Sequence, residues 1–359
     1  MSAQYKIVPA AFQKLLLKWF DTQGRKDLPW QQNKTAYRIW VSEVMLQQTQ
    51  VKTVIDYFHR FMKRFPNVKS LSTASIDEVL HLWTGLGYYT RARNLHRTAK
   101  IIAHDYAGQF PPDVLELQKL PGLGRSTSGA IVAIAFQKKS AILDGNVKRV
   151  LTRLYGITAW PGEKKVTDIL WKIAEELTPT RRVDDYTQAI MDLGATLCTR
   201  GMPHCELCPF TLHCKAFQLG IQKKIPQPKP RKILPVRETK LLLLQNKNHV
   251  LLQKRSASGI WGGLWSLPEA EATASEDEIS ALCKQRFHLD TRQIVYGELF
   301  RHTFSHFHLD ILPVYISIQK IPFKIMDSEQ QIWYNLQDSQ AIGLPAPVAK
   351  LLRALTCPV

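Results

Sequence analysis

The chain has 359 residues, a formal net charge of +18 and 45% hydrophobic residues. This length suggests about two domains, and the apolar content excludes a disordered tail. No apolar run reaches the roughly 18 residues of a membrane span, and the first 20 residues lack the pattern of a secretory signal. Residues 1–230 carry 33 Lys and Arg against 18 Asp and Glu. This excess favours a polyanion such as nucleic acid, although a merely basic surface gives the same count.

The segment before residue 222 has helical periodicity. Apolar residues between Val51 and Phe65 recur at three- and four-residue steps until Pro66, which predicts one helix. The same pattern repeats from Leu95 to Tyr106. Further helices are expected at residues 113–119, 126–136, 146–155, 164–177 and 184–197. Short polar or glycine-rich connections separate them, so we predict a mainly α-helical N-terminal domain.

Two acidic residues of this segment could form a catalytic pair. Glu43 stands among apolar residues at helical spacing, and a carboxyl in apolar surroundings has a raised pKa and can act as a general acid. Asp144 follows an apolar run and opens a helix, where we expect it to stay ionised. Such a pair can cleave a glycosidic bond through an oxocarbenium-like state. The alternatives are that Glu43 lies on the surface at the edge of an amphipathic helix and that Asp144 is only an N-cap.

Two connections between the expected helices have features of nucleic-acid binding. The sequence Leu-Pro-Gly-Leu-Gly contains Gly122 and Gly124. A Gly-x-Gly pattern at a helix start lets backbone N–H groups approach a phosphate. The alternative is a tight turn between two helices. The polar run that contains Gln48 and Thr49 could wedge into a base stack, or could be an ordinary turn.

Four of the six cysteines lie within 17 residues, at Cys198, Cys205, Cys208 and Cys214. Without a secretory signal, a disulfide framework is not expected, and the spacing indicates one metal site. Zinc modules usually present two similar Cys-x2-Cys pairs, whereas this sequence has one, flanked by uneven loops. The spacing therefore favours a [4Fe–4S] cluster over zinc.

The boundary between domains is expected at residues 222–237. This stretch contains four prolines, which forbid a regular helix and favour an extended connector. We therefore predict a helical domain at residues 1–221, a linker at 222–237 and a second domain at 238–359.

The second domain shows shorter, strand-like periodicity. Residues 241–244 and 250–253 flank a polar turn, which predicts a hairpin, and residues 309–318 form another β-rich run. Residues 276–287 and 347–355 are typical of helices. The second domain is therefore predicted to be α+β.

Together, these motifs resemble those of a known superfamily. The sequences LPGLG and LDGNVKRV and the spacing Cys-x6-Cys-x2-Cys-x5-Cys resemble the endonuclease III, or helix-hairpin-helix, superfamily of DNA glycosylases. The segments LPWQ, WVSEVMLQQTQV and GLGYYTRARNLH resemble its adenine DNA glycosylase branch. The resemblance covers nearly the whole chain.

The resemblance implies removal of adenine mispaired with 8-oxoguanine or guanine in duplex DNA. Glu43 would protonate adenine, Asp144 would stabilise the cationic sugar, and Asn146 would support that carboxylate. Residues implied around the flipped adenine or its strand are Trp30, Leu46, Tyr88, Ser126 and Gln188. Gln48 and Thr49 would insert at the site of 8-oxoguanine, and the four cysteines would hold the [4Fe–4S] cluster.

Ser126 distinguishes this chain from bifunctional members of the superfamily. Those enzymes carry a lysine nucleophile two residues after the second glycine of the hairpin, and Ser126 stands there. Serine cannot form the Schiff base that drives strand cleavage, so we expect a monofunctional enzyme. The alternatives are a pyrimidine-lesion glycosylase with lyase activity and a non-catalytic iron–sulfur sensor of DNA damage.

Residues 238–359 resemble the Nudix-like domain of the adenine glycosylases. Gly263, Glu269 and Glu278 follow the spacing of a Nudix box, but Ala281 and Leu282 replace its paired glutamates. We therefore expect a domain that binds without hydrolysing.

One stretch of this domain is implied in recognition of the lesion. By resemblance, Phe304, Ser305 and His306 form the loop that reaches 8-oxoguanine, and a serine hydroxyl suits a base with an N7 donor and an O8 acceptor. The alternative is an ordinary strand end. The expected partner is duplex DNA with A:8-oxoG or A:G mispairs, and no association with a membrane is expected. We expect a monomer in the cytoplasm, associated with the nucleoid.

Overall fold

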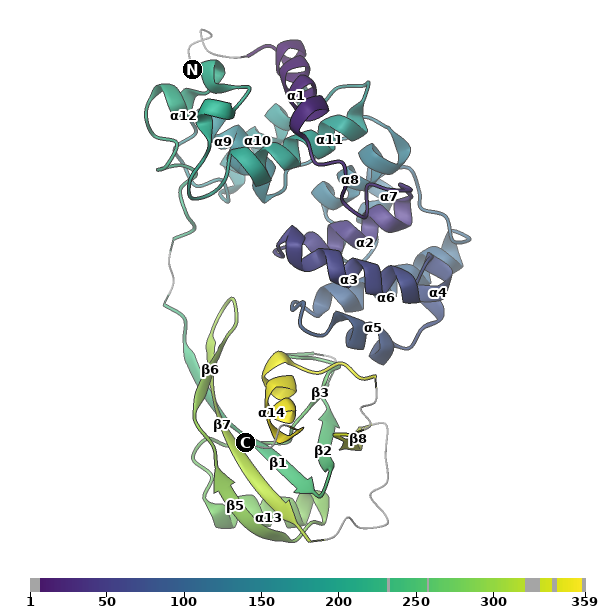
Figure 1. The fold of residues 1–359 in the computed structure, drawn as a ribbon, viewed down its shortest axis with the longest axis vertical. Coiled ribbons are helices and arrows are strands. Elements are labelled where there is room, and N and C mark those ends of the chain that lie inside the picture. The colour runs from purple at the N-terminus through teal and green to yellow at the C-terminus, as the bar shows by residue number, and fades with distance from the viewer. Residues whose placement is uncertain (1–6, 231–232, 257, 320–329, 338–340, 357–359) are drawn as a thin grey trace. The chain divides into compact units, whose positions relative to one another are not determined.

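The computed structural model describes residues 7–230, 233–256, 258–319, 330–337 and 341–356. The chain forms two compact units, which are described separately (Figure 1). The first contains the described residues of 1–73 and 94–231, and the second contains residues 74–93 and the described residues from 232 onward. None of the described helices is long and apolar enough to cross a lipid bilayer.

The first unit is helical, as the sequence predicts. Its helices are α1 (Pro9–Gln23), α2 (Ala36–Leu46), α3 (Val51–Arg64), α4 (Val68–Thr73), most of α6 (Thr90–Asp105), α7 (Val114–Gln118), α8 (Arg125–Phe136), α9 (Gly145–Leu154), α10 (Lys164–Leu177), α11 (Val183–Asp192) and α12 (Lys215–Gln218). Short 3-10 turns lie at Cys205–Leu207 and Thr211–His213. The helices expected between residues 51 and 177 are confirmed within a few residues.

The helix expected at residues 184–197 differs from the prediction. The α-helix ends at Asp192, and a π-helical turn continues over Leu193–Leu197. Gly194 lies in this turn against α9, where an added Cβ would come within 2.6 Å of the Cβ of Asn146. This close approach is a tertiary contact, so helical periodicity could not indicate it. Such π-helical turns are frequent at functional sites.

Helix α2 is buried on most of its surface. It packs against α3 and α8, and its buried residues include Ile39, Trp40, Val44 and Met45. An almost fully buried helix leaves little freedom to shift or rotate. Glu43, which lies on this helix, is therefore held in a fixed position.

The second unit contains a mixed β-sheet. Its strands are β1 (Val236–Asn246), β2 (His249–Lys254), β3 (Trp265–Ser266), β4 (Glu269–Ala270), β5 (Thr291–Tyr296), β6 (Phe300–Thr303), β7 (His308–Ile318) and β8 (Gln331–Asn335). The main order is β3-β2-β1-β7-β5, with β1 and β7 parallel. The β1–β2 hairpin and the β7 strand confirm the prediction of an α+β domain.

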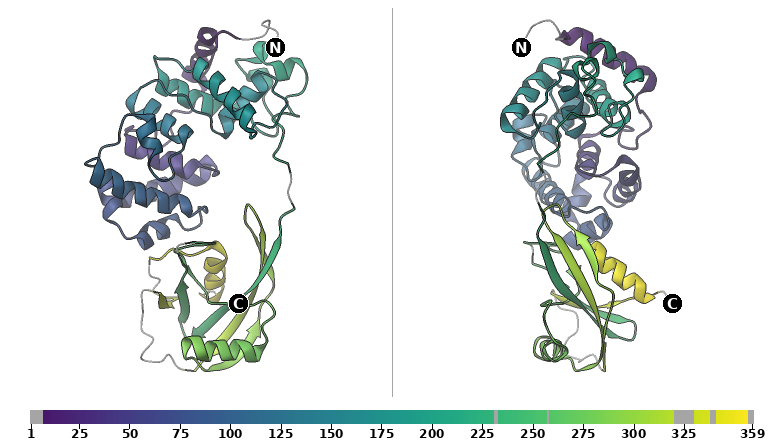
Figure 2. Two further views of the ribbon diagram at one scale, coloured as in Figure 1. Left: turned by 180° about the vertical axis from the view of Figure 1, so that it is seen from behind. Right: turned by 90° about the vertical axis from the view of Figure 1, so that its left-hand side faces the viewer.

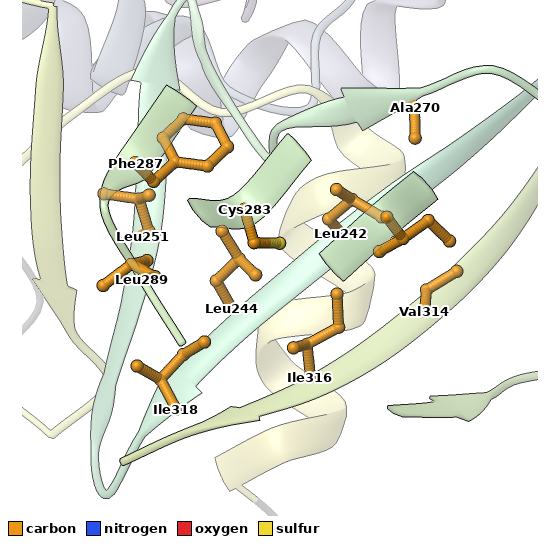
Figure 3. Close-up of a cluster of buried hydrophobic side chains, with 11 residues drawn as sticks. Leu242, Leu244, Leu251, Ala270, Cys283, Phe287, Leu289, Val314, Ile316 and Ile318 are labelled. Carbon is orange, nitrogen blue, oxygen red and sulfur yellow. The ribbon is translucent and has the colours of Figure 1, made fainter. Parts of the chain in front are cut away.

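Two helices cover the two faces of this sheet (Figures 2 and 3). Helix α13 (Glu276–Phe287) spans the predicted residues, and α14 (Ala346–Thr356) lies close to its prediction. Leu242 and Leu244 of β1 face α13, in a core with Cys283 and Phe287. Leu241 and Leu243 alternate with them and are also buried, as expected for a strand covered on both faces.

Residues 74–93 belong to the second unit, although they lie inside the domain predicted at residues 1–221. Helix α5 (Ile76–Trp83) begins this segment. Asp77 forms an ion pair of 2.8 Å with Lys254, and the hydroxyl of Tyr89 donates to the carbonyl of Leu344 at 2.9 Å. These contacts join residues more than 170 positions apart, so local sequence patterns could not predict them. Within the linker expected at 222–237, residues 231 and 232 lie outside the described residues.

Candidate active site

A cavity of about 440 Å³ lies in the first unit, between the end of α2 and the starts of α8 and α9. Predicted site residues that line it are Trp30, Glu43, Leu46, Gln48, Thr49, Ser126, Asp144, Asn146 and Gln188. These positions are spread over more than 150 residues of sequence. The cavity therefore unites most of the residues for which the sequence predicts a role in the chemistry.

Glu43 lies in the cavity wall with its backbone in the buried helix α2. Burial raises the pKa of its carboxyl to about 8, and the nearby Asp144 adds to the shift. Burial acts in this direction because it disfavours the charged carboxylate. At neutral pH the side chain can therefore hold the proton that a general acid delivers.

Asp144 is the N-cap of α9. One carboxylate oxygen accepts a hydrogen bond of 2.8 Å from the Val147 amide, and the other accepts one of 3.1 Å from the Asn146 side chain. Asn146 is held in turn by Arg149, whose guanidinium donates a hydrogen bond of 2.8 Å to the side-chain oxygen of Asn146. The carboxylate is thus fixed at the cavity edge.

The pKa of Asp144 is shifted in the opposite direction from the sequence expectation. A helix start stabilises the charged form, and the sequence therefore predicts a carboxyl held ionised. In the structure, burial outweighs the hydrogen bonds from Val147 and Asn146 and raises the pKa of Asp144 above its ordinary value. The sequence could not show how deeply this helix start is enclosed.

Ser126 and Thr127 connect α8 to other walls of the cavity. The Ser126 hydroxyl accepts a hydrogen bond of 3.0 Å from the Leu143 amide, directly before Asp144. The Thr127 hydroxyl accepts one of 3.3 Å from the Gln47 side chain, in the turn that contains Gln48 and Thr49. Ser126 therefore supports the backbone next to Asp144.

Several cavity residues were missed by the sequence analysis. They are Arg25, Leu28, Val51, Thr127, Gly145, Met191 and Ala195, whereas Gln47 belongs to the polar run that could wedge into a base stack. Arg25 is informative because it pairs with the buried Asp192 across 167 positions of sequence. Its only signal in the sequence is its place beside Lys26 in a polar segment, which does not distinguish it from a surface arginine.

Tyr88 and the C-terminal candidates for recognition of the lesion lie in the second unit. Tyr88 is 49% exposed and has a left-handed backbone, and it does not line the cavity. Phe304, Ser305 and His306 form the turn between β6 and β7. The Phe304 amide donates to the Phe307 carbonyl at 2.9 Å, and the two rings stack with centroids 4.6 Å apart. This closed turn leaves Ser305 and His306 exposed at its tip.

The hairpin glycines lie between α7 and α8 and differ in their surroundings. Gly122 has a φ of +80°, and an added Cβ would lie 2.9 Å from the Cβ of Asn94. Gly124 is the N-cap of α8 with a φ of −83°, and nothing lies within 4 Å of an added Cβ. Gly122 is thus required by the fold, whereas Gly124 opens the N-terminus of α8 to solvent or to a ligand.

Substitution of the two glycines by alanine should therefore separate stability from DNA binding. Gly122→Ala is expected to destabilise the protein by about 1–3 kcal/mol, because alanine is strained at positive φ. Gly124→Ala should unfold at nearly the wild-type temperature but bind duplex DNA more weakly, because its methyl group occupies the approach to the free N–H groups. Thermal melting and DNA titration would measure both effects. Wild-type DNA affinity in the Gly124→Ala protein would contradict a phosphate site at this hairpin.

The four clustered cysteines line one small cavity beside Arg153. Burial raises the pKa of the Cys208 thiol to about 12 and also raises those of Cys205 and Cys214, with further contributions from neighbouring thiols. An Arg153 guanidinium nitrogen lies 3.4 Å from the sulfur of Cys198. Among the described residues, no three His, Cys, Asp or Glu side chains are arranged to hold a single metal ion.

Comparison with protein families identifies two regions of the chain. The HhH-GPD superfamily of base excision DNA repair proteins matches residues 41–176, and the NUDIX domain family matches residues 240–354. The adenine DNA glycosylase of Buchnera aphidicola subsp. Baizongia pistaciae is 43% identical over 342 residues, which is 95% of each chain. The human adenine DNA glycosylase is 44% identical over 224 residues, which is 60% of this chain and 41% of the human protein.

Solved structures resemble the helical part of the chain. A thermostable thymine-DNA glycosylase is 27% identical with a TM-score of 0.54, over 59% of this chain and 97% of that chain. An endonuclease III in a non-covalent DNA complex has a TM-score of 0.51 over 61% of this chain and 100% of that chain. At 20% identity, this second similarity concerns the fold alone.

Proposed function

This chain belongs to the adenine DNA glycosylases, enzymes of base excision repair, and we propose that it removes adenine mispaired with 8-oxoguanine or guanine in duplex DNA. The observation that carries the proposal is the presence of Glu43 and Asp144 in one cavity. A protonated carboxyl and a hydrogen-bonded carboxylate are the pair that hydrolysis of a glycosidic bond requires.

In the proposed reaction, the adenine nucleotide is flipped out of the helix into the cavity. Glu43 gives its proton to N7 of adenine, which makes the base a better leaving group as the glycosidic bond breaks. Asp144 faces the cationic sugar that develops, and Asn146 keeps its carboxylate in position. Glu43, now ionised, can then accept a proton from the attacking water. Trp30, Leu46, Tyr88 and Gln188 are proposed to contact the flipped adenine or its strand.

We propose that the enzyme is monofunctional. The hydroxyl of Ser126 cannot form a Schiff base with the sugar, and it is engaged with the Leu143 amide. The test uses duplexes with A:8-oxoG, A:G or thymine glycol, and compares strand breaks before and after hot alkali. We expect breaks at adenine only after alkali and no complex trapped by borohydride. Trapping with borohydride would contradict the monofunctional proposal, and release of thymine glycol alone would contradict the proposed substrate.

The C-terminal domain is proposed to recognise the lesion without hydrolysing a nucleotide. Two acidic residues that fit the spacing of a Nudix box have structural partners. Glu269 forms an ion pair with Arg255, and Glu278 accepts a hydrogen bond of 2.7 Å from the backbone amide of Ser275, the N-cap residue of α13. The exposed turn of Phe304, Ser305 and His306 offers polar groups for 8-oxoguanine. Gln48 and Thr49 are proposed to insert from the catalytic unit.

Loss of the polar groups in this turn should lower discrimination between lesions. We expect the double substitution Ser305→Ala and His306→Ala to reduce the preference for A:8-oxoG over A:G by roughly 5–100-fold, because hydrogen bonds to base edges carry such differences. Excision of adenine opposite guanine should stay near the wild-type rate. His249→Ala, at the start of β2, serves as the control. An unchanged ratio of the two excision rates would rule out this role.

Cys198, Cys205, Cys208 and Cys214 are proposed to hold a [4Fe–4S] cluster. The support is a set of four thiols around one cavity, in a sequence with one Cys-x2-Cys pair instead of the two similar pairs that zinc modules usually present. The thiols would lose their protons, which burial favours, when they bind the cluster. Because binding requires the folded loop, it would also stabilise the loop. We expect iron and acid-labile sulfide in the purified protein, with a brown colour. A colourless, fully active protein that contains zinc would contradict this assignment.

The charge distribution supports binding of the DNA phosphate backbone by the first unit. The excess of basic residues before residue 231 should give salt-dependent and largely sequence-independent affinity for duplex DNA. Gly122 and Gly124 are proposed to face a phosphate. We propose a monomer that acts in the cytoplasm on the nucleoid.

A further inference from the structure

Gln188 has a defined amide orientation in the wall of the catalytic cavity. Its side-chain nitrogen donates a hydrogen bond of 2.9 Å to a carboxylate oxygen of Asp192, one helical turn further along α11. A carboxylate can only accept hydrogen bonds, so the amide nitrogen must be the atom that faces Asp192. The amide oxygen is then the atom left to face the cavity.

Asp192 is itself fixed by Arg25. It is fully buried, and the Arg25 guanidinium donates to one carboxylate oxygen at 2.6 and 3.1 Å. The Arg25 backbone amide donates to the other oxygen at 2.9 Å. Three donors on two sides prevent the carboxylate from rotating, and the ion pair keeps it an acceptor. Gln188 therefore cannot reverse its amide without placing its oxygen against this carboxylate.

We propose that Asp192 is a positioning residue that makes Gln188 a selective acceptor for the 6-amino group of adenine. The inference rests on the proposed function and adds a determinant of base selection to it. Adenine carries a hydrogen-bond donor at position 6, whereas guanine and hypoxanthine carry an oxygen there. A fixed amide oxygen pairs with the donor and leaves a 6-oxo purine with two facing acceptors. An unpaired buried polar group costs enough to slow excision by about 10–100-fold.

The experiment measures single-turnover excision of adenine and of hypoxanthine, each opposite 8-oxoguanine in the same duplex. The proteins are the wild type, Asp192→Asn, Gln188→Leu and Asp184→Asn. Asp184→Asn makes the same chemical change on α11, but at a partly exposed carboxylate that pairs with Lys34. The quantity compared between proteins is the ratio of the two excision rates, because the intrinsic lability of each base is the same for every protein and cancels from that comparison.

We expect the wild type and Asp184→Asn to prefer adenine by about 10–100-fold. In Asp192→Asn, one oxygen must serve the donors of Arg25 and Gln188, and the new amide can bond the oxygen of Gln188. Both orientations of Gln188 then become accessible, so the ratio should fall at least about tenfold, with faster hypoxanthine excision. A merely structural role would slow both reactions together and leave the ratio unchanged.

Gln188→Leu keeps the test decisive if loss of the buried ion pair prevents folding of Asp192→Asn. Gln188→Leu should also lose the preference, because it has no amide oxygen. A wild-type ratio in the folded Asp192→Asn protein, or in Gln188→Leu, would overturn the inference, as would a wild type without preference. If the wild type releases no adenine at all, the proposed function fails instead. Adenine release with unchanged ratios would refute only the role of Asp192.

Discussion

Glu43→Gln is expected to lower the single-turnover rate of adenine release by about 10²–10⁴-fold, the usual contribution of a general acid. Glutamine has nearly the shape of the protonated glutamic acid but has no acidic proton to deliver. Because the side chain lies in a cavity wall that is already formed, we expect folding and DNA affinity to change little. Thermal melting and DNA titration check these two points, and quench assays measure the rate.

The exposed Glu163 offers a matched control on the same domain. Glu163→Gln removes one carboxylate at the start of α10, outside the cavity, and should leave the excision rate unchanged. A Glu43→Gln protein that excises adenine at the wild-type rate would refute the role of Glu43 as the acid.

The raised pKa of Glu43 also predicts the alkaline limb of the pH profile. The active form of the acid is protonated, so its population is full well below pH 8 and falls tenfold per pH unit well above it. We therefore expect the wild-type rate to decrease as the pH rises through about 8. In Glu43→Gln this limb should disappear from the residual activity. A limb that persists unchanged would assign the titration to another group.

Asp144→Asn is the second substitution with a large expected effect. It removes the negative charge that is proposed to face the developing cation, and loss of such electrostatic stabilisation costs about 10²–10³-fold in rate. Stability should change less, because the remaining oxygen can still cap α9 through the Val147 amide. Single-turnover excision and thermal melting would measure the two quantities separately.

Asp113→Asn provides the matched control for Asp144→Asn. Asp113 is also a helix N-cap, and its carboxylate accepts hydrogen bonds from the Leu115 and Glu116 amides at the exposed start of α7. The same chemical change there should leave the excision rate at its wild-type value. Equal losses of rate in both variants would indicate a general effect of N-cap substitution and would contradict a direct role for Asp144.

Local patterns predicted most of the secondary structure. The residues from Val51 to Phe65 show the apolar periodicity of a helix. The segment of α13 begins with Ser275 and has Glu278 three residues later, which is the pattern of a capping box. The β1–β2 hairpin follows in the same way from two apolar runs around a polar turn. Such features depend on neighbours within a few residues, and the sequence contains that information directly.

The geometry of the site depended on contacts that sequence patterns do not encode. Nothing near Arg25 indicates its pairing with Asp192, and nothing near Gly194 indicates the close approach of Asn146. The burial that raises the pKa of Asp144 likewise comes from chain segments far away in sequence. The identities of most of the cavity residues could be predicted by resemblance, whereas their orientation and protonation required the tertiary structure.

The assignment of residues 74–93 to the second unit means that the chain passes between the two units three times. The proline-rich connector is only one of these crossings. A protease that cuts at the connector would therefore leave the C-terminal fragment attached by noncovalent contacts such as Asp77 with Lys254 and Tyr89 with Leu344. The nicked protein should elute as a single species under native conditions and separate into two fragments only in denaturant. Severing the linker would thus not yield a free catalytic domain.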